Sequence, residues 1–188
     1  MVMKKKLLTG IYRREGEWNL VEMKISHPAQ LFNSLDPSPF RERDLDAEAA
    51  EYLVSAMREL HGHRHVKIVV YLPGQVDERT RAAVTDAIHN YFRYREIAAR
   101  FSLRQVLRLG HRSLLVGLLF LAVCTALWRF VFTGDGMGDR LLHEGALIMG
   151  WVAMWKPLEI LLYDWWPVLA DIRLCQRIVT MPVEVRHG

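Results

Sequence analysis

The chain has 188 residues, of which 51% are apolar, and a formal net charge of +4. This length fits one domain, or a small domain with a membrane anchor. The two cysteines, Cys124 and Cys175, lie in separate segments and predict no disulfide framework. The basic start is followed by no apolar segment, so we expect no cleavable signal peptide.

Residues 1–76 predict a small α/β domain with a mixed sheet. The segments 18–26 and 66–72 have the length and β-branched content of strands. The tail alternates over 178–185, and Pro182 restricts that segment to an edge strand at best. A further strand within 6–14 could join through a turn at 15–17.

A helix over about 44–62 separates the two central strands. Asp44 or Asp46 can cap its start, and Gly62 suits the position after its end. A strand–helix–strand unit favours parallel strands joined by a right-handed crossover.

The rest of the chain predicts a basic helix over 77–111, a transmembrane hairpin over 112–170 and a tail over 171–188. Residues 113–133 form an apolar run that is long enough to cross a bilayer. A second, longer apolar stretch covers about 141–170, so it must tilt or kink. The chain is therefore expected to be an α+β membrane protein with two spans.

The arginines of the chain indicate its orientation. They gather before the first span and after the second, so the positive-inside rule predicts that both termini are cytoplasmic. A nucleic-acid patch could look similar, but a series that ends at a span favours contact with an anionic inner leaflet, and we expect no nucleic acid. The four nearest the span are Arg100, Arg104, Arg108 and Arg112.

Charged residues within the second span form the main candidate site. Lys156 and Glu159 are three residues apart, so they can pair on one helix face. Counted from Gly145, both are expected in the inner half of the bilayer, where a lone charge costs about 3 kcal/mol. Pro157 frees a backbone carbonyl there, and Tyr163 continues the face. The pair either fixes helix register in an oligomer or contributes to an ion or proton path, or to a ligand site, between subunits.

Two smaller groups flank this site. Asp164, Trp165 and Trp166 are expected to anchor the inner interface. At the outer end, a hairpin clasp is expected from Arg129, His143 and Glu144.

Three histidines, His61, His63 and His65, alternate just before the second strand and could bind zinc or copper only if they lay on a strand. The adjacent helix cap makes a turn the better interpretation, so we expect no metal site and no cofactor. No phosphate loop, nucleophile elbow, HExxH or CxxC motif is present in the sequence.

The stretch WKPLEILLYDWWP (155–167), together with IHNYFRYREIAAR, resembles a family of bacterial two-span inner-membrane proteins. The resemblance covers most of the chain after about Ala29 and implies an inner-membrane location without an activity. A weaker layout similarity links the chain to calcium uniporter pore subunits. That family has a Trp-Asp-x-x-Glu-Pro signature. Trp155 and Glu159 match the spacing of its Trp and Glu, but Lys156 stands where the signature has Asp.

From these observations we expect a non-enzymatic, homo-oligomeric scaffold, sensor or docking module with an unidentified cytoplasmic or membrane partner. An oligomeric ion or proton channel is the first alternative. An accessory subunit of a membrane enzyme is the second.

Overall fold

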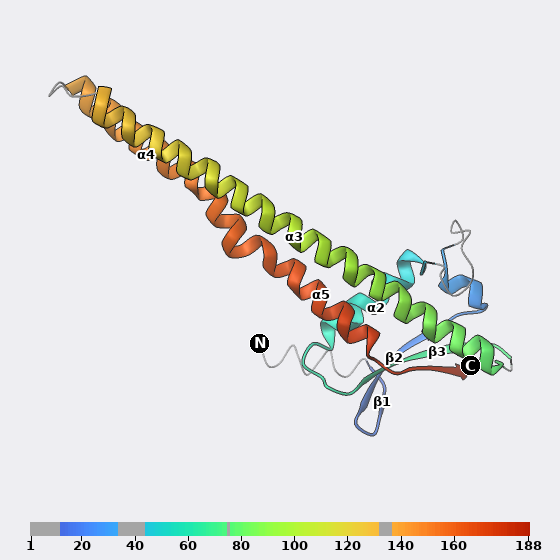
Figure 1. Cartoon of the computed structure of the whole chain (residues 1–188). Coiled ribbons are helices and arrows are strands. Elements are labelled where there is room, and N and C mark those ends of the chain that lie inside the picture. The colour runs from blue at the N-terminus through green and yellow to red at the C-terminus, as the bar shows by residue number, and fades with distance from the viewer. Residues whose placement is uncertain (1–11, 34–43, 75, 132–136) are drawn as a thin grey trace. The chain divides into compact units, whose positions relative to one another are not determined.

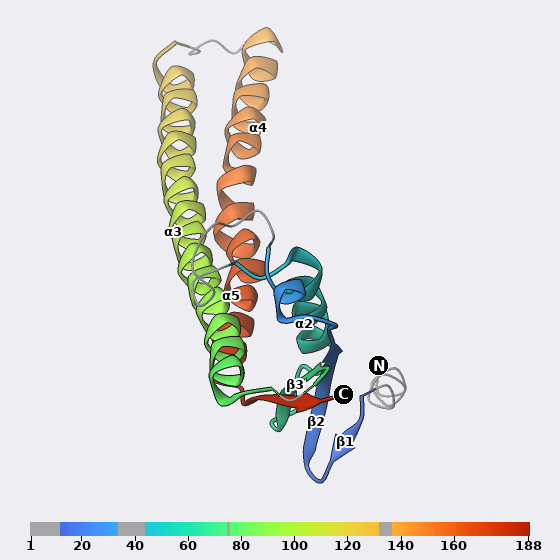
Figure 2. The same ribbon diagram turned by 90° about the vertical axis from the view of Figure 1, so that its right-hand side faces the viewer.

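A computed structural model describes residues 12–33, 44–74, 76–131 and 137–188, with the side chains at 128–131, 137, 139–143 and 147 outside the described set. The elements in chain order are β1 (Arg14–Glu15), β2 (Trp18–Lys24), η1 (Pro28–Leu31), α2 (Ala47–Glu59), β3 (Val66–Leu72), α3 (Glu78–Val131), α4 (Met137–Glu159), η2 (Ile160–Asp164), α5 (Trp165–Val179) and β4 (Val183–His187). Figures 1 and 2 show them in two views.

The chain divides into two compact units. The first, here called the sheet unit, contains Met1–Ile97 and Ile172–Gly188. The second, the hairpin unit, contains Ala98–Asp171. The first twenty residues of α3 thus belong with the sheet, and the chain leaves the sheet unit through α3 and returns to it through α5.

The sheet has four strands in the order β1-β2-β3-β4. β2 and β3 are parallel, as expected for strands joined by α2, and β4 is parallel to β3. β1 pairs antiparallel with β2 through a tight turn at Gly16, whose φ of 60° suits glycine. The mixed α/β class and the four-stranded mixed sheet confirm the expected fold of this unit.

One face of the sheet carries the hydrophobic core. Strand residues such as Ile68 and Val70 pack there with Leu53 of α2, Ile88 of α3 and Ile178 of α5. Figure 1 shows the three helices on the same side of the strands. The apolar face of each helix therefore packs against the apolar face of the sheet. This arrangement follows from the 3.6-residue period of the helices and the two-residue period of the strands.

Several boundaries differ from those expected. The tail is helical through Val179 and becomes a strand only at Val183, because Pro182 cannot donate to the ladder and β4 starts after it. β4 is nevertheless an edge strand, as expected. Asp46, and not Asp44, caps α2 by accepting from the Glu48 amide at 2.9 Å. The expected strand at 6–14 lies mostly outside the described residues.

The hairpin unit contains two helical stretches that are long and apolar enough to cross a membrane, judged by length and composition. α3 runs uninterrupted from Glu78 to Val131, so the helix of residues 77–111 and the first span are one element. The second stretch is continuous from Met137 to Val179 but changes to a π-helical turn at Ile160–Asp164.

Candidate functional site

Glycines determine how α3 and α4 meet within the hairpin unit. A Cβ on Gly150 would lie 2.5 Å from Leu121 Cδ1, and a Cβ on Gly117 would lie 3.0 Å from Met154 Sδ. A Cβ on Gly110 would lie 2.8 Å from a Leu161 methyl carbon. Small residues at these places let the two helices approach closely, as is common between membrane helices.

The same contacts fix the register of the hairpin. Gly110 faces the Ile160–Leu161 step, Gly117 faces the 153–154 step, and Gly150 faces Leu121. Since the helices are antiparallel, Lys156 is level with residue 115 and Glu159 with residue 112. The charge pair therefore lies beside the first residues of the apolar run, closer to its edge than counting along the second span indicates.

Lys156 and Glu159 form the expected ion pair, with Nζ 3.1 Å from a Glu159 carboxylate oxygen. Both side chains remain exposed, at 66% and 45%. Their face lies beside the direct contact between α3 and α4, which uses Ala153, Pro157 and Ile160. The pair is thus satisfied within its own helix and available to surroundings outside the hairpin.

The backbone beyond this pair departs from α-helical geometry. Pro157 lies within α4, and the π-helical turn η2 follows three residues later. The indole N–H of Trp165 donates to the Leu161 carbonyl at 2.9 Å. This bond gives the Leu161 carbonyl a side-chain donor within the π-helical turn. Trp165 therefore has a hydrogen-bond partner within its own helix in addition to its expected role at the interface. The rings of Trp165 and Trp166 meet edge-on, with their centroids 6.0 Å apart.

A groove of about 510 Å³ runs between α3 and α4 next to the charge pair. Its lining combines two cations with small and apolar side chains, namely Arg112, Ser113, Val116, Gly117, Phe120, Ala153, Lys156 and Pro157. A second hollow of about 420 Å³ shares Arg112 and includes Arg108. Arg112 was expected to be a juxtamembrane residue. Its place in the same groove lining as Lys156 follows from the hairpin register, which no sequence pattern specifies.

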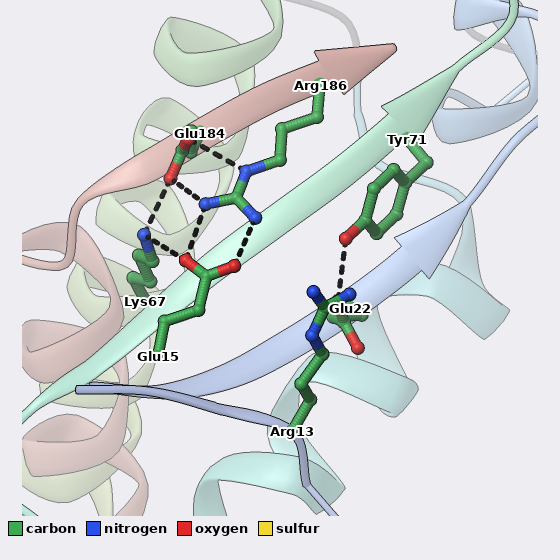
Figure 3. A network of polar contacts seen from close by, with 7 residues as sticks. All are labelled: Arg13, Glu15, Glu22, Lys67, Tyr71, Glu184 and Arg186. Atoms are coloured by element: carbon green, nitrogen blue, oxygen red, sulfur yellow. Dashed lines mark hydrogen bonds and ion pairs between the residues drawn. The ribbon is translucent and has the colours of Figure 1, made fainter. Parts of the chain in front are cut away.

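A second polar cluster occupies the face of the sheet opposite the core (Figure 3). The Arg186 guanidinium donates to both Glu15 carboxylate oxygens at 2.6 and 2.7 Å, and its Nε donates to Glu184 at 2.8 Å. Lys67 Nζ lies 2.7 Å from Glu184 and 3.2 Å from Glu15. We call these four residues the β-face quartet.

The quartet alters the acidity of its carboxylates. The hydrogen bonds from Arg186, and then those from Lys67, hold the pKa of Glu15 and the pKa of Glu184 at about 2. Beneath the charges, Leu20 and Val69 are almost fully buried on the same face. The alternation of charged and apolar residues in β4 indicates that Glu184 and Arg186 share one face, but no local pattern specifies their partners in β1 and β3. The two negative and two positive charges of the quartet balance. Its ion pairs connect β1, β3 and β4, so we interpret the quartet as a structural cluster.

The three histidines do not gather into a metal site. Among the described residues no group of three histidine, cysteine, aspartate or glutamate side chains could hold a metal. The His61 and His63 amides donate to Arg58 and Leu60 carbonyls in a turn. His65 packs edge-on against Trp18 at 5.4 Å. Arg177 also donates to the Leu60 and His63 carbonyls, which holds this turn against α5.

The expected outer clasp falls largely outside the described side chains, since those of Arg129 and His143 are not among them. Glu144 is exposed. Arg100, Arg104 and Arg108 lie on α3 in the hairpin unit, and Arg108 Nε donates to the Arg104 carbonyl at 3.3 Å. Tyr163 is exposed and contacts Trp166 edge-on.

No protein-family model matches the chain, and neither a curated protein nor a solved structure shows significant similarity to it.

Proposed function

We propose that this chain is an integral membrane protein of two spans whose hairpin anchors the sheet unit as a homo-oligomeric scaffold or docking module. The observation that carries the proposal is the pairing of β3 with β4. β3 precedes both long helices and β4 follows them, so one sheet joins the chain on either side of the hairpin.

This pairing supports a specific topology. If α3 crosses a bilayer once and the second helical stretch crosses back, both ends of the hairpin return to one side, which the shared sheet requires. The basic residues before and after the spans favour the cytoplasmic side of a bacterial inner membrane. The argument from the sheet does not depend on charge, so the two supports are independent.

The exposed apolar side chains of the hairpin favour surroundings of lipid or protein over water. Side chains including Leu115, Leu119, Trp151 and Trp155 are more than 60% exposed. Such a continuous apolar surface is costly in water and is typical of membrane or interaction surfaces. The Lys156 face lies on this outward surface and is where a second copy would pack in the proposed oligomer.

The test combines oligomeric state with contact mapping. In a variant with both native cysteines changed to serine, Val152→Cys places one thiol on the Lys156 face. We expect a disulfide-linked dimer in membranes and an oligomer in mild detergent by light scattering. The matched control is Leu118→Cys, on the exposed surface of α3, which should cross-link less. A monomer in mild detergent, with no cross-link at Val152, would contradict the proposal.

The channel alternative makes a separate prediction. If Glu159 lined an ion path, Glu159→Gln would abolish flux in liposomes while leaving the oligomer intact. Lys156 neutralises this carboxylate at 3.1 Å, which weakens a cation-binding ring. If the unchanged protein conducts no ions in liposomes, the channel alternative is excluded.

A further inference from the structure

The groove between α3 and α4 has the dimensions of a ligand site. Its volume of about 510 Å³ falls in the range of roughly 300–1,000 Å³ that is common for small-molecule pockets. All of its lining residues belong to the hairpin unit, so its shape depends on the close helix contact at Gly117 and not on the sheet.

The lining changes in character along the groove. Arg112, Ser113 and Lys156 provide its polar groups, near the start of the apolar run. Val116 and Phe120 continue the wall into that run, and Pro157 and Ala153 form the opposite wall. A molecule that fits must therefore have an anionic group joined to an apolar chain.

The cations at the polar end are available to a ligand. The Arg112 guanidinium makes no hydrogen bond or ion pair with any side chain or carbonyl that the structure describes. Lys156 uses one donor on Glu159 and retains two more N–H groups. Arg108 adds a third positive charge in the neighbouring hollow. Two carboxylates, Glu159 and Asp164, act electrostatically on Lys156. The three cations outnumber them by one, so the local charge balance favours a negatively charged group.

We propose that this groove binds one anionic phospholipid per chain, with its phosphodiester between Arg112 and Lys156 and an acyl chain along Val116 and Phe120. The inference rests on the proposed membrane insertion. A bilayer supplies such a molecule from the exposed side of the groove, and basic pockets between membrane helices at the cytoplasmic face recognise anionic headgroups. A free phosphate would satisfy the cations but leave the apolar wall empty.

The experiment uses the full-length chain in mild detergent, with phosphatidylglycerol and phosphatidylcholine as separate probes in native mass spectrometry. We expect one tightly bound phosphatidylglycerol per chain and weaker binding of phosphatidylcholine. The double variant Arg112→Gln/Lys156→Gln should weaken phosphatidylglycerol binding about 30-fold, because each cation near an anionic lipid contributes about a factor of five. Arg104→Gln removes a nearby cation outside the groove and should leave affinity nearly unchanged.

The apolar wall has its own variant and control. Val116→Trp fills the groove and should displace the lipid, whereas Leu115→Trp adds the same bulk at a neighbouring exposed position outside the lining. Equal binding of both lipids, or equal effects of the two tryptophan variants, would overturn the proposal. So would full competition by inorganic phosphate with no effect of Val116→Trp, which identifies a phosphate site.

Two further readouts separate this proposal from the proposed function. Carbonate extraction reports insertion: protein that stays in the membrane pellet but shows no phosphatidylglycerol preference overturns the lipid site alone. Light scattering of the Val116→Trp variant reports assembly. A loss of oligomer with unchanged lipid binding would mean that a second copy, and not a lipid, occupies the groove.

Discussion

Arg186 of β4 donates two hydrogen bonds to the carboxylate of Glu15 in β1, although 171 residues separate them in the chain. This bidentate pair crosses the sheet face above β2 and β3 (Figure 3). Planar two-point contacts of this kind are among the stronger ion pairs because both partners are held in one geometry. The pair therefore links the first and last described strands, on either side of the helical hairpin.

Removing the guanidinium should loosen both edge strands. For Arg186→Gln we expect a decrease of about 2–5 °C in the Tm of the full chain. Amide hydrogen exchange should also be faster in β1 and β4 than in α2. Arg13→Gln is the matched control, because Arg13 is more exposed and lies 3.8 Å from Glu22. Equal effects of the two substitutions would contradict a special role for the bidentate pair.

The β-face quartet predicts a specific acid sensitivity. In the folded chain the pKa of Glu15 and that of Glu184 are lowered to about 2 from an ordinary value of 4.5. A lowered pKa contributes stability that is fully present above about pH 4.5 and is lost as the pH falls toward 2. Thermal unfolding between pH 6 and pH 2.5 should show this loss. The loss of stability on acidification should be smaller in Glu184→Gln, which has one of the two carboxyls fewer. A pKa near 4.5 for both Glu15 and Glu184 in the folded chain would contradict the role of the quartet.

Close helix contact at Gly150 predicts a position-dependent effect of bulk. Gly150→Leu places side-chain atoms against Leu121 and should destabilise the hairpin by about 1–3 kcal/mol. Gly145→Leu is the control, because nothing lies within 4 Å of a Cβ there. Thermal stability in detergent compares the two variants. A neutral Gly150→Leu together with a harmful Gly145→Leu would contradict the register described above.

The π-helical turn predicts a role for a single indole donor. Trp165→Phe keeps an aromatic ring but removes the bond to the Leu161 carbonyl, at a cost of about 0.5–1.5 kcal/mol. Hydrogen exchange of the amides at 160–164 should accelerate. Trp166→Phe is the natural comparison, since Trp166 is 57% exposed and its side chain makes only ring contacts with the residues that the structure describes. Unchanged exchange in Trp165→Phe would show that the turn holds without this donor.

Local patterns were sufficient for most of the sheet unit. β-branched content located β2 and β3, capping chemistry located α2, and the Gly16 turn was recognisable from its residues. The start of β4 was placed too early, because alternation extends into residues that tertiary contacts keep in α5. The predicted boundary between a helix over 77–111 and the first span is absent from the structure, because α3 continues through Gly110; glycine in a helix interior is disfavoured but tolerated.

The candidate sites were predictable only in part. Lys156 and Glu159 are three residues apart, so helical geometry alone predicted their pair. Their proximity to Arg112 depends on which turn of α3 faces which turn of α4, and the close contacts at Gly110, Gly117 and Gly150 decide this. The β-face quartet joins segments from both ends of the chain, and no local pattern specifies such a pairing.

The central claim is that the sheet closes across a two-span hairpin, so that both ends of the hairpin lie on one side of the membrane. Paired alkaline phosphatase and green fluorescent protein fusions in bacteria test it most directly. Fused after Gly188, the fluorescent reporter should be bright and the phosphatase inactive. Fused after Gly138, between the spans, the phosphatase should be active and the fluorescent reporter dark. The same reporter active at both sites would contradict the account.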